Sequence, residues 1–209
     1  MRIIIPARAG SKGLPFKNRK LFKHTADIIP DIMKHKTYVV TDDEEIKLMA
    51  IEAGFKALHR PDGLSQDETS TKSVMKYTLE KLDVKNETII MLYLTYPERT
   101  WQDVNNAVAM FKCNDISSLL CKKPLKTSPF LMLKSEPRNR GSQLFYHDLY
   151  RRQDYPECFE ISHFIVMFNS SELDKLNNNL YNNDTYFMEI SEKTIDVDEK
   201  KDLDRFEER

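Results

Sequence analysis

Residues 88–94 are Thr88-Ile89-Ile90-Met91-Leu92-Tyr93-Leu94, a nearly unbroken apolar run. Such a run is typical of a strand that is buried on both faces, as in a parallel sheet. The pattern that follows predicts a helix at residues 101–111 and another strand at residues 116–121. A strand, a helix and a strand in this order indicate a βαβ unit, so we expect an α/β fold.

The alternation extends toward the N-terminus. We expect strands at residues 3–6, 38–41 and 55–59, and helices at about residues 44–53 and 69–82. Asp42 and Asp43 precede the first of these helices, where acidic side chains can cap free N–H groups, and Gly54 follows it, as glycine does at many helix ends. The predicted architecture is a doubly wound, mostly parallel, Rossmann-like sheet.

The segment from about residue 124 to residue 184 has a different character. Strands are expected at residues 163–168, and just beyond the segment at 186–190, while the rest is irregular and rich in aromatic residues. We therefore predict a small inserted lobe that packs beside the sheet. Because no glycine- or serine-rich linker marks a boundary, residues 1–209 are predicted to form one domain.

The composition excludes several classes of function. The formal net charge is −1, so no overall field favours binding to nucleic acid or to a membrane surface. Cys113, Cys121 and Cys158 are scattered and form no CxxC pair, which argues against a zinc site or a disulfide framework. No apolar stretch reaches membrane-spanning length, and the first apolar run is too short for a signal peptide, so a cytoplasmic location is expected.

A basic, glycine-containing loop follows the first predicted strand. It reads Ala7-Arg8-Ala9-Gly10-Ser11-Lys12-Gly13 and continues to Lys17-Asn18. The loop lies at the carboxyl end of a strand, where open α/β sheets bind ligands, and its two glycines allow close backbone approach. Its three cations suit a triphosphate, although it is not a Walker A loop. On these residues alone, an ordinary basic surface loop is an open alternative.

The loop resembles the CTP-binding signature of the CMP-N-acetylneuraminic acid synthetase family, also called acylneuraminate cytidylyltransferases. That signature has the form Ala-Arg-x-x-Ser-Lys-Gly followed by Lys-Asn. Further patches resemble the family in the same order along the chain: Val40 to Asp43, Arg60-Pro61 with Asp67 and Ser70-Thr71, Thr95 to Thr100, Pro124 to Thr127, Arg152-Gln153, and Ile195 to Asp198 with Asp202-Leu203. The resemblance implies the fold of the nucleotide-diphospho-sugar transferases and often a homodimer.

The resemblance also implies a reaction and roles for residues. The anomeric hydroxyl of an acidic sugar would attack the α-phosphorus of CTP and release pyrophosphate. Arg8 and Lys12 are expected to grip the triphosphate as catalytic residues, with Ser11 and Lys17 beside them. The nucleoside end is assigned to Asn18, Arg60, Ser70 and Thr71, and the acceptor end to Tyr93, Lys126 and Arg152. The inserted lobe would serve the acceptor or a dimer contact.

A pair of aspartates near the C-terminus is the candidate metal site. Asp196 and Asp198 alternate with Ile195 and Val197, so on a strand both carboxylates would face one side. Two carboxylates on one face suit a cation such as Mg²⁺, which prefers hard oxygen ligands. A solvated acidic stretch is the alternative on composition, and the resemblance favours the metal, with Asp198 also assigned a catalytic role.

The chain departs from the family pattern mainly on the acceptor side. Tyr93 stands where the family often has glutamine, Ser162-His163 replaces an Asn-Gly pair, and Glu160 stands near a basic position. The family's Gly-x-Pro-Leu-Ile element after the Lys-Asn motif is also absent. Cytidylyl transfer is therefore a firmer prediction than sialic acid as the acceptor.

Other readings stay open. The acceptor could be a related acid, such as legionaminic, pseudaminic or 3-deoxy-octulosonic acid, although synthetases for the last of these carry a different loop. A glycosyltransferase also combines an α/β nucleotide site with an Asp-x-Asp, usually placed earlier in the chain. A non-catalytic nucleotide-binding relative is the third reading. The five histidines form no cluster, and only His163 is expected close to the acceptor.

Overall fold

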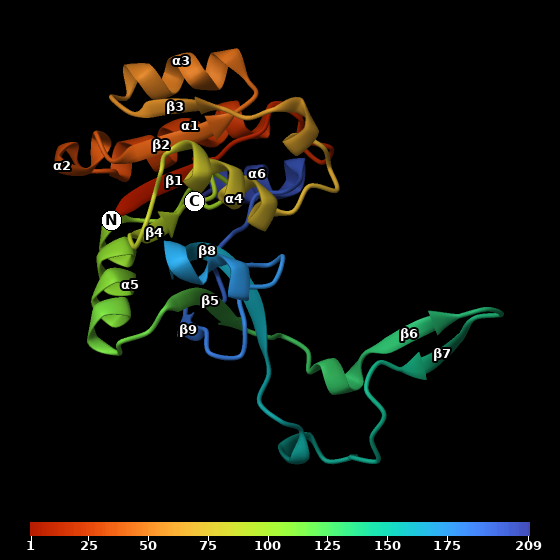
Figure 1. Cartoon of the computed structure of the whole chain (residues 1–209). Helices are drawn as coiled ribbons and strands as arrows, with labels where there is room; N and C mark the ends of the chain where they lie inside the picture. Colours follow the sequence, from red (N-terminus) through yellow and green to blue (C-terminus); the bar gives the residue numbers. More distant parts are fainter.

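The computed structural model describes residues 1–209 and has a twisted central sheet with helices on both faces (Figure 1). The strand order is β3-β2-β1-β4-β8-β5-β9. β8 runs antiparallel to β4 and β5, and the other neighbouring strands are parallel. The strands of this sheet are β1 (Arg2–Pro6), β2 (Thr37–Thr41), β3 (Lys56–His59), β4 (Thr88–Met91), β5 (Ser118–Pro124), β8 (Phe159–Asn169) and β9 (Tyr186–Glu189). The predicted doubly wound, mostly parallel α/β fold is confirmed.

Two apolar cores cover the two faces of the sheet. In β1, Ile3 and Ile5 point into one core and Ile4 into the other, as the two-residue period of a strand requires, and all three are fully buried. The first core holds residues of α1 (Lys17–Ile28), α3 (Glu44–Glu52), α5 (Trp101–Cys113) and α6 (Lys200–Glu207), and the second holds residues of α4 (Thr71–Lys81) and the short helix η4 (Ser170–Lys175). The helices are all too short or too polar to span a bilayer. The minor helices are α2 (Asp31–Lys34), η1 (Asp62–Leu64), η2 (Pro129–Leu131) and η3 (Arg152–Asp154).

The predicted helix signals act as expected in α3. The Asp43 side chain accepts hydrogen bonds from the backbone N–H groups of Glu45 and Ile46, so it is the N-cap. Gly54, just past the end of the helix, has a φ of 83°, in the left-handed region that glycine tolerates best. Together they fix where α3 begins and where the chain turns into β3.

The apolar run at residues 88–94 is a strand only as far as Met91. Beyond it, the carbonyl oxygen of Tyr93 accepts a hydrogen bond from Arg99 Nη2 at 2.8 Å instead of pairing with a strand. Arg99 is 2% exposed and also donates to the Phe164 carbonyl in β8 at 2.7 Å. This buried guanidinium turns the chain out of the sheet, so that Tyr93 to Tyr96 lie at its carboxyl end.

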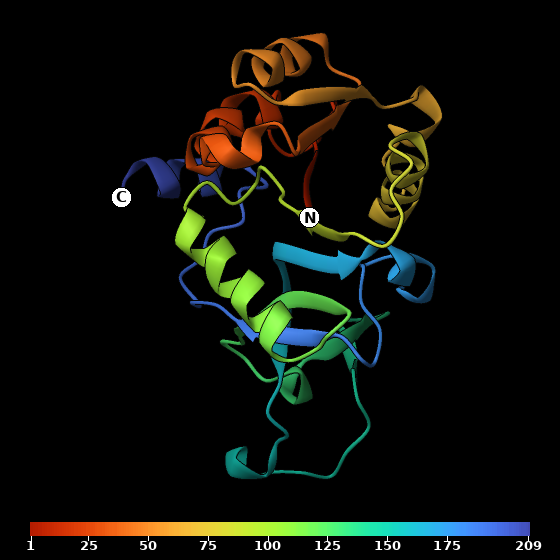
Figure 2. The same ribbon diagram turned by 60° about the vertical axis from the view of Figure 1, so that its left-hand side comes forward.

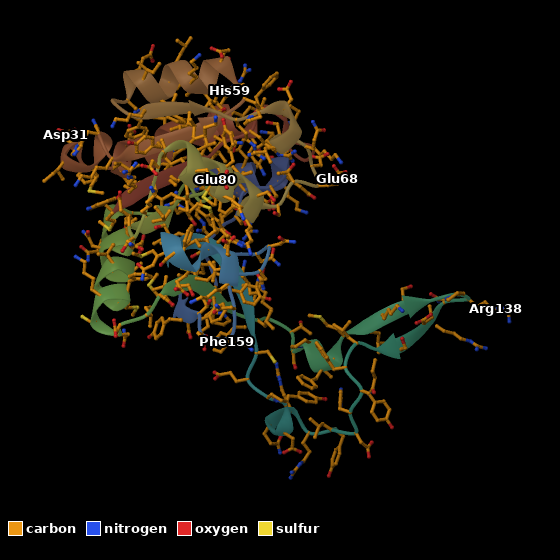
Figure 3. The ribbon with its side chains drawn as sticks, in the orientation of Figure 1. Asp31, His59, Glu68, Glu80, Arg138 and Phe159 are labelled. Atoms are coloured by element: carbon orange, nitrogen blue, oxygen red, sulfur yellow. The ribbon has the colours of Figure 1, made fainter.

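Residues 124–184 do not form one lobe beside the sheet. Their middle part is β8, which lies inside the sheet between β4 and β5. Residues 125–158, here called the arm, leave the end of β5, extend away from the sheet and return to the start of β8 (Figures 1 and 2). The arm carries the separate hairpin of β6 (Leu133–Glu136) and β7 (Arg140–Gln143), and Figure 3 shows Arg138 at its tip.

The aspartate pair lies in an extended segment that is not part of any strand, so the prediction of a strand at residues 195–198 is wrong. The Val197 N–H donates to the Thr95 carbonyl at 2.8 Å, but no ladder forms. The predicted alternation is nevertheless present, because Ile195 and Val197 are buried while Asp198 is exposed and Asp196 is intermediate. The segment leads into α6, which packs beside α1 through an edge-to-face contact of Phe206 with His24 (Figure 2).

Candidate active site

The basic loop connects β1 to α1. A carboxylate from another loop forms ion pairs with two of its cations. Asp67 accepts from Arg8 Nη1 and forms an ion pair with Lys12 Nζ, each at 2.5 Å. Hydrogen bonding to Lys12 and then to Arg8 holds the pKa of Asp67 below its usual range. Asn18 Nδ2 donates to the Arg8 carbonyl at 2.8 Å, which ties the first turn of α1 to the loop. The loop therefore presents organised positive charge at the end of β1.

The aspartate segment packs directly against this loop. Lys17 Nζ lies 2.6 Å from Asp198 Oδ1, and the Lys17 side chain is 13% exposed while that of Asp198 is 68% exposed. A Cβ atom on Gly13 would lie only 2.5 Å from the Asp198 carbonyl oxygen, so this position requires glycine. The structure thus brings residues from the two ends of the chain into one site.

A cavity of about 320 Å³, here called the loop cavity, opens between the basic loop and the ends of the central strands. Its walls are mostly polar. The predicted residues that line it are Arg8, Ser11, Lys17, Asn18, Arg60, Thr71, Tyr93, Asp196 and Asp198. Gln66, Asp67, Thr69, Thr95, Tyr96 and His163 also line it. Most of the residues assigned to the nucleotide are therefore gathered around one space.

A second part of the cavity wall is built from Arg60, Thr71 and Tyr93. Arg60 is 5% exposed, and its Nε and Nη2 both donate to the Leu64 carbonyl. Burial lowers the pKa of Arg60, and burial likewise raises the pKa of Tyr93. The Tyr93 hydroxyl and Thr71 Oγ1 are 2.5 Å apart, and the Tyr93 ring meets His163 edge to face at 5.6 Å. Tyr93, expected at the acceptor end, thus lies in the loop cavity.

A second cavity of about 550 Å³, here called the arm-side cavity, lies between the end of β5, the start of β8 and the aspartate segment. Lys126 lines it, together with Lys123, Glu160, Ser162 and Arg205. Lys123 Nζ lies 3.2 Å from Glu160 Oε1, so the acidic departure at residue 160 already has a cationic partner. Tyr96, Asp196 and Asp198 line both cavities, and the aspartate pair therefore lies where the two spaces meet.

Asp196 is the more buried member of the pair. Its Oδ2 accepts from the Tyr96 hydroxyl at 2.8 Å, whereas its Oδ1 is buried without any hydrogen-bond partner. Burial is the main cause that raises the pKa of Asp196, and hydrogen bonding by Thr95 and Tyr96 partly opposes it. A buried, unpartnered carboxylate oxygen is unfavourable unless a ligand satisfies it. The structure contains no group of three or more His, Cys, Asp or Glu side chains placed to hold a metal ion. Two carboxylates still fit Mg²⁺, which keeps waters and takes phosphate oxygens as its remaining ligands.

Three predicted residues line neither cavity. Ser70 is the N-cap of α4, and its hydroxyl accepts from the Ser73 N–H at 3.1 Å. The Lys12 side chain is 82% exposed at the rim, where Asp67 holds it. Arg152 is exposed on the arm and lines neither cavity.

No local pattern in the sequence marks Tyr96 as a cavity residue, although it lies within the Thr95 to Thr100 stretch. His163, expected close to the acceptor, lines the loop cavity beside Tyr93. The sequence indicates Asp67 only as part of a motif, and its pairing with the basic loop is a tertiary contact.

Comparison with known proteins places the chain in a family. A family model described as cytidylyltransferase matches residues 2–119, which is more than half of the chain. N-acylneuraminate cytidylyltransferase of Streptococcus agalactiae serotype III is 25% identical over 211 residues, covering 96% of this chain and 51% of that protein. The chain thus spans about half the length of this relative.

Two further proteins resemble the chain over most of its length. The CMP-N,N'-diacetyllegionaminic acid synthase of Legionella pneumophila is 27% identical over 194 residues, covering 87% of this chain and 77% of that protein. Among solved structures, a CMP:2-keto-3-deoxy-manno-octonic acid synthetase complexed with CTP superposes with a TM-score of 0.68 at 17% identity, covering 98% of this chain and 95% of the other. The last likeness concerns the fold alone.

Proposed function

The chain belongs to the cytidylyltransferase family, and on that basis we propose that it transfers CMP from CTP to the anomeric hydroxyl of an acidic sugar and releases pyrophosphate. One observation supports this most strongly. Asp196 and Asp198 line both the loop cavity and the arm-side cavity, so a reacting phosphate at their junction is accessible to a nucleotide from one side and to an acceptor from the other.

CTP binds in the loop cavity. Arg8, Lys12 and Lys17 neutralise the triphosphate, and they do so by exchanging the carboxylates of Asp67 and Asp198 for phosphate oxygens. Ser11 contributes a hydroxyl beside the phosphates. Transfer of this kind depends chiefly on positioning and on neutralising charge. Before the nucleotide binds, the two aspartates hold the three cations in place.

The nucleoside end lies between the start of α1 and the wall formed by Arg60 and Thr71. Asn18, Arg60 and Thr71 provide donors and acceptors there, and Ser70 contributes by capping α4, which carries Thr71 in its first turn. A pocket that forms hydrogen bonds to a base edge rejects bases that leave its groups unpaired, so CTP is preferred over ATP and GTP.

Asp196 and Asp198 would hold Mg²⁺, which would neutralise charge that develops on the phosphates. The contribution of this chain is to keep the two carboxylates at the junction, with Asp196 fixed by burial and Asp198 free to leave Lys17.

The acceptor is a sialic acid or a related nonulosonic acid. Two relatives support this class, since their names refer to N-acylneuraminate and to diacetyllegionaminic acid. The acceptor enters the arm-side cavity, where Lys126 can bind its carboxylate. Tyr93, assigned to the acceptor end from the sequence, would reach it only from the loop cavity, on the far side of the junction.

The active form is a homodimer built through the arm. Leu133, Tyr146 and Tyr150 on the arm are 67%, 98% and 85% exposed, and such side chains are typical of a covered surface. Arg152 on the same arm would then serve the acceptor site of the second copy. A cytoplasmic location is part of the proposal, because the cysteines are scattered and form no CxxC pair, as is usual in a reducing compartment.

The test is pyrophosphate release from CTP and Mg²⁺ with a panel of sugar acids: N-acetylneuraminic, legionaminic, pseudaminic and 3-deoxy-octulosonic acid. We expect turnover with at least one nonulosonic acid. CTP binding without turnover on any acid would favour a non-catalytic relative, and transfer of a sugar from a nucleotide sugar would favour a glycosyltransferase. Equal turnover with all four nucleoside triphosphates would contradict the assignment of the base.

A further inference from the structure

Tyr96 lines both cavities, is 4% exposed, and contacts the buried aspartate of the pair. We propose that Tyr96 is a positioning residue, whose hydroxyl holds Asp196 Oδ2 so that Oδ1 is presented to the Mg²⁺ of the nucleotide complex. This inference rests on the proposed function and extends it by assigning a residue that acts through Asp196 rather than on the substrates.

The direction of the hydrogen bonds supports this role. Ser162 Oγ donates to the Tyr96 hydroxyl at 3.3 Å, and that hydroxyl lies 2.8 Å from Asp196 Oδ2. A phenol has one proton to donate and can also accept. Because Ser162 supplies a proton to the phenol oxygen, the phenol proton itself points to Asp196. The three groups thus form a chain that ends on one carboxylate oxygen.

The Tyr96 ring is anchored by a second aromatic ring. It packs edge to face on Phe164 with ring centroids 5.6 Å apart and an interplanar angle of 87°. The Phe164 carbonyl is bound by Arg99, which is itself buried and also binds the carbonyl of Tyr93. A hydroxyl on such a fixed ring can orient a carboxylate, because neither ring nor backbone is free to follow it.

The two oxygens of Asp196 differ in a way that points to a ligand. Oδ2 accepts from the Tyr96 hydroxyl, whereas Oδ1 is buried and makes no hydrogen bond of normal geometry, although the Thr95 side chain is a further polar neighbour of this carboxylate. If Tyr96 served only to fill the core, an unpartnered carboxylate oxygen beside it would have no reason to persist. The neighbouring Asp198 is different, since it is mostly exposed and paired with Lys17. Asp196 is therefore the preorganised ligand and Asp198 the adaptable one.

The test is the substitution Tyr96→Phe, which keeps the ring and removes only the hydroxyl. Binding of the non-hydrolysable analogue α,β-methylene-CTP is measured by calorimetry with and without Mn²⁺, and the ratio of the two affinities gives the contribution of the metal. Loss of an outer-sphere partner typically weakens metal binding by about 10–100-fold. We therefore expect Tyr96→Phe to lower this ratio at least about tenfold and to leave metal-free binding of the analogue within about twofold of wild type.

Three further variants make the test specific. In the Asp196→Asn background, Tyr96→Phe should have no additional effect on the Mn²⁺ ratio, because the two residues act as a unit. Ser162→Ala should lower the ratio in the same direction, by about threefold, the size of one neutral hydrogen bond. Tyr77→Phe, which removes a hydroxyl that donates to the His59 carbonyl outside both cavities, should match wild type.

The outcomes separate the inference from the proposed function. An unchanged Mn²⁺ ratio in Tyr96→Phe, with wild-type protein that binds the analogue and releases pyrophosphate, overturns the positioning role alone. Equal loss of binding with and without Mn²⁺ also overturns it, since that is the signature of a merely structural residue. Wild-type protein in which Mn²⁺ has no effect on the analogue overturns the inference and the metal site together.

Discussion

The loop cavity and the arm hold their charged side chains in opposite ways. At the loop cavity, the pairs of Arg8 with Asp67 and of Lys17 with Asp198 join residues 59 and 181 positions apart. On the arm, Arg151 pairs with Asp154 three residues away, and Lys134 pairs with Glu136 on the same short strand. The loop cavity and its walls, here called the nucleotide half, are thus organised by tertiary structure, whereas the charged side chains of the arm form only local pairs.

The same contrast holds for apolar side chains. Tyr96 beside the loop cavity is 4% exposed, whereas Tyr146 on the arm is 98% exposed. Burying exposed apolar surface is favourable, and the fold of one chain leaves this surface in water, so association with another chain can bury it. We infer that a single chain forms the nucleotide half by itself. The acceptor half, which is the arm-side cavity together with the arm, takes its final form when a second copy covers the arm.

The largest expected effect is that of Asp198→Asn, which tests the nucleotide half at the junction. The change keeps the shape and removes one charge from the metal site, so we expect the rate of pyrophosphate release to fall by at least about 100-fold. The melting temperature should stay close to wild type, because the Asp198 side chain is 68% exposed. Asp204→Asn in α6 is the matched control and should keep the wild-type rate. A wild-type rate in Asp198→Asn would favour the solvated acidic stretch.

An intermediate effect is expected for Lys12→Ala. The change removes a charge-assisted contact to the triphosphate, so CTP should bind at least about tenfold more weakly. Calorimetric titration with CTP measures this, with Lys20→Ala on the exposed side of α1 as the control. Thermal unfolding of the nucleotide-free protein should hardly change, since the Lys12 side chain is 82% exposed. Unaltered CTP affinity would remove Lys12 from the site.

The smallest effect is expected for Arg152→Ala on the arm, and it separates the two halves most sharply. An exposed ionic contact contributes little, so the KM for the sugar acid should rise by about threefold to fivefold while the KM for CTP stays constant. Arg140→Ala in β7 is the control. If the arm acts through a second copy, dilution below the dimer dissociation constant should raise the acceptor KM of wild type and abolish the difference. A change in the KM for CTP would contradict the division proposed here.

Much of the nucleotide half could be predicted because its signals are contiguous. The loop from Ala7 to Asn18 contains its glycines and cations within twelve neighbouring positions, and the cap at Asp43 binds two N–H groups within the next three residues. Local features of this kind depend on backbone geometry and short-range hydrogen bonds, which the sequence order itself specifies.

The remainder depends on contacts that no local pattern encodes. The apolar residues of β8 predict a strand, but not that it lies antiparallel between β4 and β5. The contact of Tyr96 with Asp196 spans 100 positions, and the pairing of Asp67 with the loop depends on how η1 and its following turn approach β1. The arm leaves the sheet at the end of β5. Its residues beyond that point are mostly exposed, so no pattern of buried side chains indicates the direction that the chain takes.

The pairing of Lys17 with Asp198 has a consequence for how the molecule folds. Contacts between residues 181 positions apart form late, because the intervening chain must first be ordered before its ends can meet. The sheet and the second core can condense while the last segment is still loose, because Ile195, Val197 and Leu203 of that segment belong only to the first core. CTP would then bind only to chains in which the two distant segments have already joined. By mass action, CTP therefore stabilises the fully folded state.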